Sequence, residues 1–129
     1  MAHMVASATE SNPLSPSSGH EWDGVAGGFG RLAARFGDLD FVHCIGNPMR
    51  LGCSWNVFVN GRGWSRQGDY NTPHLLPCYC PVCCCVHWAP IALCSITVFV
   101  NGRGAGRIYD RIAGCTAVMT GSTNVQAGG

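Results

Sequence analysis

Lysine is absent from this chain, and charged residues of all kinds make up only 12% of its 129 positions. The eight basic residues are all arginines, set against seven acidic residues, and the formal net charge is +1. A charge so nearly balanced gives no electrostatic support for binding nucleic acid or an anionic membrane surface. Soluble domains carry roughly 25% charged residues, so a content this low is compatible with a surface that is covered by a partner.

Long apolar runs are also missing. No stretch reaches the roughly 18 apolar residues needed to span a bilayer, and the first residues lack the charged start and apolar run of a signal peptide. We therefore expect no transmembrane segment and no conventional secretion. Residues 1–30 are rich in Ser, Pro and Gly and are expected to form a flexible N-terminal extension that could bind cargo. Residues 31–129 are long enough for one small domain.

Glycine is abundant, with 18 residues, and several of these glycines belong to a repeat. The heptapeptide VFVNGRG occurs at residues 57–63 and again at 98–104, inside longer matching segments at 53–69 and 94–110. Each copy places Asn-Gly between extended apolar runs. This is the strongest short-range hairpin signal, because both central residues of a type I′ turn need positive φ. The sequence therefore predicts two equivalent β-hairpins.

Two half-copies of the repeat flank these hairpins. RLAARFGD at residues 31–38 matches the second half of the unit, and GSTNVQAGG at residues 121–129 matches the first half. Joining the two segments would make a third unit. We therefore expect a mainly β fold of hairpins with pseudo-threefold symmetry, in which residues 31–38 and 121–129 lie side by side.

Metal-ligand residue types recur at one position of the repeat. The residue five positions after the last aspartate of each unit is His43, His74 or Cys115. A threefold axis would bring these side chains together, and His87, in the long loop between the second and third units, supplies a fourth ligand. Three imidazoles and one thiolate make a closed tetrahedral set that suits Zn²⁺, with iron as the second choice. Cys44 is the alternative ligand beside His43, and any one of these histidines taken alone is also compatible with a hydrogen-bonded core residue.

Five of the nine cysteines fall within residues 78–85, which read CYCPVCCC. Their spacing is not the paired C-x-x-C of a zinc ribbon, and neighbouring side chains of an extended segment point to opposite faces. Apolar packing or one or two disulfides therefore explain this cluster better than a second metal does. Because the total is odd, at least one thiol is unpaired within the chain.

The hairpin followed by small residues, an arginine and Gly-Asp resembles the PAAR-repeat family, whose members cap the spike tip of type VI secretion systems and contractile phage tails. Residues 32–35, LAAR, carry three of the four residues that name the family, whereas residues 63–66 and 104–107 keep mainly the arginine. The resemblance covers about residues 31–129. It implies a small PAAR-like cone with pseudo-threefold symmetry and one structural metal ion near its apex, held by His43, His74, His87 and Cys115.

The same resemblance implies a structural protein that caps a trimeric β-helical spike, one cone per trimer, and sharpens it for piercing a cell envelope. Its partners would be that spike and, transiently, the target membrane, and its location a phage baseplate or tail tip or the tip of a type VI secretion spike. Catalysis is not expected, because four ligands close the metal's coordination shell and no acidic general base stands near them in sequence. The alternative is a free-standing β binding module stapled by disulfides or a metal.

The chain departs from the family pattern at three points. No copy has the proline, Trp64 stands where the family has a small residue, and Tyr109 replaces the glycine before Asp110. These departures leave the metal-ligand pattern untouched and bear on the backbone of the second and third units.

Overall fold

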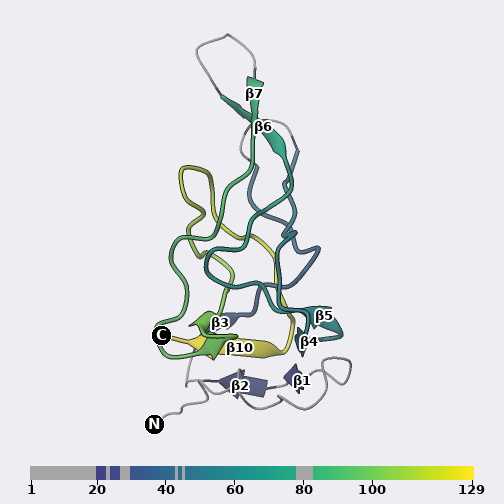
Figure 1. Cartoon of the computed structure of the whole chain (residues 1–129), viewed down its shortest axis with the longest axis vertical. Helices are drawn as coiled ribbons and strands as arrows, with labels where there is room; N and C mark the ends of the chain where they lie inside the picture. The colour runs from purple at the N-terminus through teal and green to yellow at the C-terminus, as the bar shows by residue number, and fades with distance from the viewer. Residues whose placement is uncertain (1–19, 23, 27–29, 43, 45, 78–82) are drawn as a thin grey trace.

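The computed structural model describes residues 20–22, 24–26, 30–42, 44, 46–77 and 83–129. The described residues form short strands and contain no helix. The strands are β1 (His20–Trp22), β2 (Gly24–Ala26), β3 (Gly30–Leu32), β4 (Val57–Val59), β5 (Arg62–Gly63), β6 (His74–Pro77), β7 (Cys83–His87), β8 (Phe99–Val100), β9 (Arg103–Gly104) and β10 (Val125–Gly128). Figure 1 shows a tapering molecule, with β3, β4, β5 and β10 at the wide base and the β6–β7 ladder at the narrow end. The expected mainly β fold is confirmed.

The two predicted hairpins are the antiparallel pairs β4–β5 and β8–β9. Their turns carry positive φ at both central residues, with values of 53° and 76° at Asn60 and Gly61 and 54° and 78° at Asn101 and Gly102. The third hairpin is split between the two ends of the repeat region, because β10 pairs antiparallel with β3. The half-copies recognised in the sequence therefore do combine into one unit.

A closed ring of three backbone hydrogen bonds ties the units together around a central axis. The amide of Ala34 donates to the carbonyl of Gly106 at 2.9 Å, Gly106 donates to Ser65 at 2.8 Å, and Ser65 donates to Ala34 at 2.9 Å. These residues occupy the same position in the three units. Each unit thus donates to a second and accepts from the third, which is the arrangement expected of pseudo-threefold symmetry.

The arginine and aspartate of each repeat form a buried ion pair. In the second unit, the amide and Nε of Arg66 both donate to Asp69 Oδ2 at 2.8 Å, and Nη2 donates to Oδ1 at 3.1 Å. Arg35 with Asp38 and Arg107 with Asp110 repeat this geometry. Such bidentate pairs have a fixed direction, so they hold the turn after each hairpin in one conformation.

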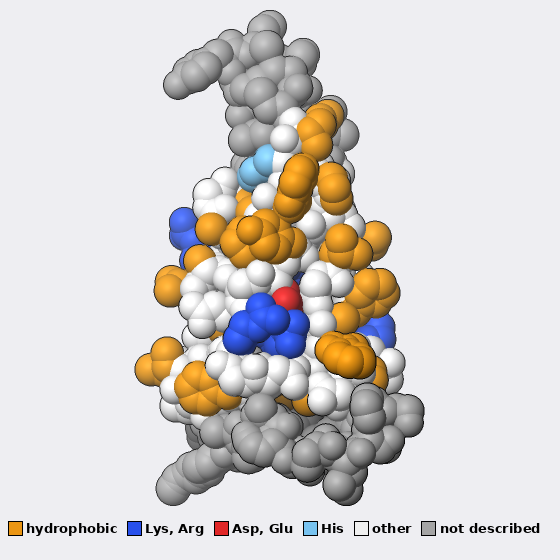
Figure 2. Space-filling view, in the orientation of Figure 1, with side chains coloured by type: hydrophobic (Ala, Val, Ile, Leu, Met, Phe, Trp, Pro, Cys, Tyr) orange, Lys and Arg blue, Asp and Glu red, His pale blue; other side chains and the backbone are white. Residues whose placement is uncertain are grey.

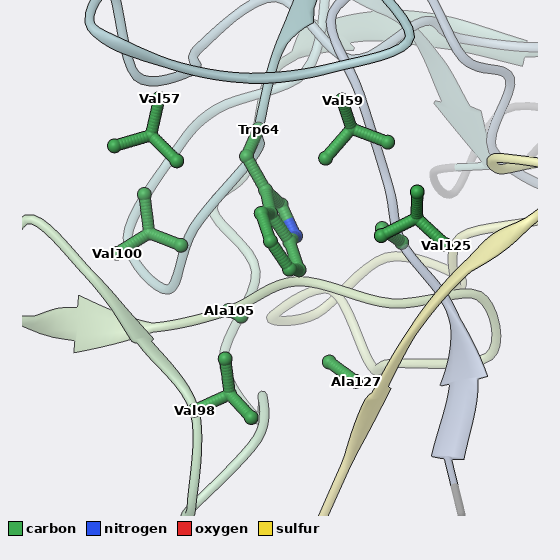
Figure 3. Close-up of a cluster of buried hydrophobic side chains, with 9 residues drawn as sticks. Val57, Val59, Trp64, Val98, Val100, Ala105, Val125 and Ala127 are labelled. Carbon is green, nitrogen blue, oxygen red and sulfur yellow. The ribbon is translucent and has the colours of Figure 1, made fainter. Parts of the chain in front are cut away.

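The axis near the base is filled by one large side chain and two small ones. Ala33, Trp64 and Ala105 occupy equivalent positions, and each is fully buried. Figure 3 shows the Trp64 ring lying among valines from several strands, with Ala105 and Ala127 below it. The Trp64 Nε1 group donates to the carbonyl of Gly106 at 3.0 Å, so its one polar atom is satisfied. Trp64, although larger than the small residue expected here, therefore fills the axis and leaves no hydrogen-bond donor of its ring unpaired.

Tyr109 keeps the backbone conformation of the glycines that it replaces. Its φ is 70°, compared with 85° at Gly37 and 90° at Gly68, which are the equivalent residues of the first and second units. The Tyr109 ring stacks on Phe41, with centroids 6.3 Å apart. Substitution of the glycine therefore leaves the turn intact and places one non-glycine residue in the left-handed region.

Replacing Gly68 with alanine is expected to lower the free energy of unfolding by about 1–2 kcal/mol, because an L-residue is strained at this φ. The change is measured by denaturant unfolding. Tyr109→Ala is the matched control, since its left-handed backbone already carries a side chain. An equal loss in both variants would show that the conformation of the turn does not cause the effect.

Residues 20–22 and 24–26, assigned to the expected extension, form strands at the base. β1 runs parallel to β4, and β2 runs parallel to β10. The structure thus pairs part of this segment with the cone, while residues 1–19 lie outside the described residues. The sequence placed the start of the domain at residue 31, and in the structure Gly30 is the first residue of β3.

Candidate metal centre

His74 is the first residue of β6 and lies five positions after Asp69 of the buried ion pair. The His74 Nδ1 group lies 2.8 Å from the carbonyl oxygen of Thr72. Because a carbonyl can only accept, Nδ1 must carry the proton and donate it. The lone pair of the neutral ring is then on Nε2, the tautomer that a metal ligand held by a backbone carbonyl adopts.

His87 is the last residue of β7 and lies directly opposite His74 in the β6–β7 ladder. The two Nε2 atoms are 3.0 Å apart, and the rings meet edge to face with centroids separated by 4.5 Å. Side chains of directly opposed residues project from the same face of a ladder. Strand pairing therefore brings these two imidazoles together, although 13 positions separate them in the chain.

Cys115 reaches the same point from the third unit. It follows Gly114, whose φ is 61°, and its amide donates to Ile112 at 3.0 Å in a tight turn. The Cys115 Sγ atom lies 3.2 Å from His74 Nε2. The ligand atoms of His74, His87 and Cys115 all lie within 4.8 Å of one another, and all three residues are partly buried.

The distances between these donor atoms fit a single ion. A tetrahedral zinc site, with bonds of about 2.0–2.1 Å to nitrogen and about 2.3 Å to sulfur, places two nitrogens about 3.3 Å apart and nitrogen and sulfur about 3.6 Å apart. The observed separations, 3.0 Å and 3.2 Å, are slightly shorter. Two imidazoles and a thiolate are donors for Zn²⁺ or iron, so this group could hold a metal ion.

The chain matches no known family and no curated protein. No helix among the described residues is long and apolar enough to cross a membrane. In Figure 2, histidine side chains (pale blue) are visible near the narrow end, beside hydrophobic side chains.

The sequence predicted four ligands, and the structure brings three of them together. The fourth, His43, lies outside the described residues. Cys44, the alternative ligand, is in a disulfide and offers no thiolate. Of the cysteine cluster, Cys78 and Cys80 lie outside the described residues, and residues 83–85 are part of β7.

A buried polar group near Cys115 was not predicted from the sequence. Asp40 and Arg50 are almost fully buried, and Asp40 Oδ1 lies 3.2 Å from Arg50 Nε. The Asn71 amide donates to Asp40 Oδ2 at 3.1 Å and lies 3.9 Å from Cys115 Sγ. Asp40 and Asn71 are equivalent in the repeat, and the third unit has Ile112 there. The only sign of this buried group in the sequence was that two units have a polar residue, Asp40 or Asn71, at a position where the third unit has an apolar one.

Burial dominates the electrostatics of this pair. It raises the pKa of Asp40 from 3.8 to about 6, although Arg50, Asn71 and His74 act in the opposite direction. It also lowers the pKa of Arg50, against the attraction of Asp40. Atoms Asp40 Oδ1, Arg50 Nε and Arg50 Nη2 have no hydrogen-bond partner among the described residues. Desolvation thus outweighs the mutual attraction of the two charges.

The raised pKa predicts an unusual pH dependence. A carboxyl group whose pKa is higher in the folded than in the unfolded chain stabilises the fold most at a pH below the unfolded value, 3.8, and loses that contribution as pH rises through about 6. From pH 8 to pH 4, the free energy of unfolding of the wild type should therefore rise by about 2 kcal/mol relative to that of Asp40→Asn.

The measurement is denaturant unfolding of both proteins in a chelator, so that loss of metal at low pH does not contribute. An energy difference that is constant with pH, or that moves in favour of Asp40→Asn on acidification, would contradict the assigned environment of Asp40.

Proposed function

We propose that this protein caps and sharpens a trimeric β-helical spike of a contractile injection machine. The observation that carries the proposal is the closed ring of hydrogen bonds at residues 34, 65 and 106, because a pseudo-threefold cone matches the end of a partner with true threefold symmetry. The taper seen in Figure 1 supports a piercing role, since one end is wide enough to seat on a spike while the other is narrow. One cone per trimer follows from the shared axis.

The narrow end needs a source of stability other than a core. We include in the proposed function one structural metal ion at this end, zinc in preference to iron. The molecule narrows toward the β6–β7 ladder (Figure 1), where His74, Leu75 and His87 are only partly buried, so burial of these side chains contributes little there. An ion held by His74, His87 and Cys115 would join β6, β7 and the turn at residues 112–115. When bound, it would supply a rigid junction between chain segments, and His43 would complete four ligands.

Exposed hydrophobic side chains near this end support transient contact with a target membrane. Val86 and Trp88, on either side of His87, are 62% and 56% exposed. Aromatic side chains favour the boundary between lipid and water. The protein would act at a phage baseplate or tail tip or at the tip of a type VI secretion spike, and it needs no catalytic group to do so.

The test is co-purification with a trimeric spike β-helix from the same source. Size-exclusion chromatography and native mass spectrometry are expected to show a complex of one cone and three spike chains. A monomeric β-rich protein of similar size serves as the control for non-specific association. Separate elution of cone and spike at micromolar concentrations would reject the proposal.

The disulfide at Cys44 favours a second candidate, a free-standing β binding module stapled by disulfides. Cys53 and Cys94 remain free thiols. A thiol count on denatured protein, with and without reductant, together with metal analysis, separates the two. Extensive disulfide pairing without metal in the folded protein would favour the binding module.

A further inference from the structure

The base of the cone carries three equivalent strand edges. In each hairpin, the first strand pairs along one edge with its return strand, as β4 does with β5, β8 with β9 and β10 with β3. The amide of Trp64 donates to Val57, that of Ala105 to Val98 and that of Ala33 to Val125. Neighbouring residues of a strand direct their backbone groups to opposite edges. The groups of the central residues Phe58, Phe99 and Gln126 therefore face the other, outer edge.

Two of the three outer edges are occupied by the chain's own strands. β1 lies parallel to β4 with Glu21 opposite Phe58, and β2 lies parallel to β10 with Val25 opposite Gln126. Figure 1 shows both strands beneath the base. Along β8, the third equivalent strand, no strand of the described chain is paired on the outer edge.

The two strands that occupy the outer edges, β1 and β2, are both extended and run parallel to their neighbours, but their sequences are not similar. β1 reads HEW and β2 reads GVA, so the edges accept them through backbone groups. This is the manner in which a sheet edge binds an added strand. The two contacts are only three residue pairs each, and strands this short are weakly held on their own. One side-chain contact is added, because the amide of Gly61 donates to Glu21 Oε2 at 3.0 Å.

We propose that β1 and β2 are an intrachain cap, which fills two of three strand-accepting edges until a threefold partner replaces it. The partner would offer three extended segments running parallel to β4, β8 and β10, one per edge. That this partner is a trimeric β-helical spike rests on the proposed function. The assignment of the three strand edges does not depend on it. Before the spike binds, the cap occupies the outer edges of β4 and β10. The spike therefore has to compete with the cap for these two edges, and it makes its first contact at the edge of β8.

The edges are tested by amide hydrogen exchange, followed by NMR on the full chain. Phe58 and Gln126 are expected to exchange about 100-fold more slowly than Phe99, because among the described strands only β1 and β2 cover an outer edge, and they cover the amides of Phe58 and Gln126. A double variant, Trp22→Pro and Ala26→Pro, removes amides of the cap that can donate to the neighbouring strand. It should bring the exchange of Phe58 and Gln126 close to that of Phe99, while slow exchange at Trp64 shows that the cone is folded.

Equal protection of all three amides in the wild type, or no effect of the prolines on Phe58 and Gln126, would overturn the cap. Displacement is tested by titrating a trimeric spike β-helix from the same source into both proteins. The proline variant should bind about tenfold more tightly, and Phe99 should become protected in the complex. Equal affinities would overturn the competition. If neither protein binds while the exchange pattern holds, the proposed function and displacement by a spike fail together, and the assignment of the edges stands.

Discussion

Cys115→Ala and His74→Ala proteins are expected to lose at least about 100-fold in zinc affinity, because each removes a donor and leaves an incomplete set. Metal bound only by the folded state stabilises it, by about 4 kcal/mol when free metal is 1,000 times its dissociation constant. The wild type should therefore show a higher melting temperature with zinc than in chelator. At that metal concentration a 100-fold weaker site would give no more than about 1.4 kcal/mol, so the melting temperature of both variants should rise much less with zinc than that of the wild type.

Metal analysis of the purified proteins and thermal melts with and without chelator provide the measurement. Cys53→Ala is the control, because burial raises the pKa of this thiol above its usual value and keeps it protonated. Its metal content and its response to chelator should equal those of the wild type. Unchanged metal content in Cys115→Ala, or a folded wild type that binds no metal, would rule out the metal centre.

Trp64→Ala is expected to lower the free energy of unfolding by about 3–5 kcal/mol, the range for truncating a large buried aromatic side chain. Trp64 is completely buried on the axis, and the substitution also removes the hydrogen bond to Gly106. The neighbours at equivalent positions are alanines, so they cannot fill the space. A loss of this size is a large part of the total stability of a small domain.

The control for Trp64→Ala is Trp55→Ala, since Trp55 lies in the same unit and is 74% exposed. Denaturant unfolding of both variants should show a change of no more than about 0.5 kcal/mol for Trp55→Ala. Trp64→Phe should recover part of the lost stability without the hydrogen bond. Similar losses in the two alanine variants would contradict the placement of Trp64 at the centre of the core.

The repeat made the hairpins and the split third unit predictable, because Asn-Gly turns and equal spacing are local signals. The same spacing correctly placed His74 near Cys115, while His87 was included only as the fourth donor that completes a set. Its position opposite His74 is fixed by the register of β6 and β7, which no repeat encodes. His43 stays a prediction.

Other features depend on pairings and conformations that the pattern does not contain. Nothing in the sequence pairs Asp40 with Arg50, because the two meet through backbone pairing of residues 38–40 with 48–50, which carries no turn signal or repeat. β1 and β2 were read as extension, since three-residue strands in a Ser-, Pro- and Gly-rich segment have no detectable period. Tyr109 was flagged as a departure, but only the backbone shows that it accepts the left-handed conformation.

The split hairpin also has a consequence for synthesis on the ribosome. β3 emerges early but has to wait for β10, more than ninety positions later, before it gains its antiparallel partner. Contacts this distant in sequence slow folding. The β4–β5 and β8–β9 hairpins can form as they appear, yet the cone can close only after residues 125–128 have left the exit tunnel. A nascent chain stalled before that point would have two of the three hairpins formed and the third missing, so the residues on the central axis would be exposed to solvent.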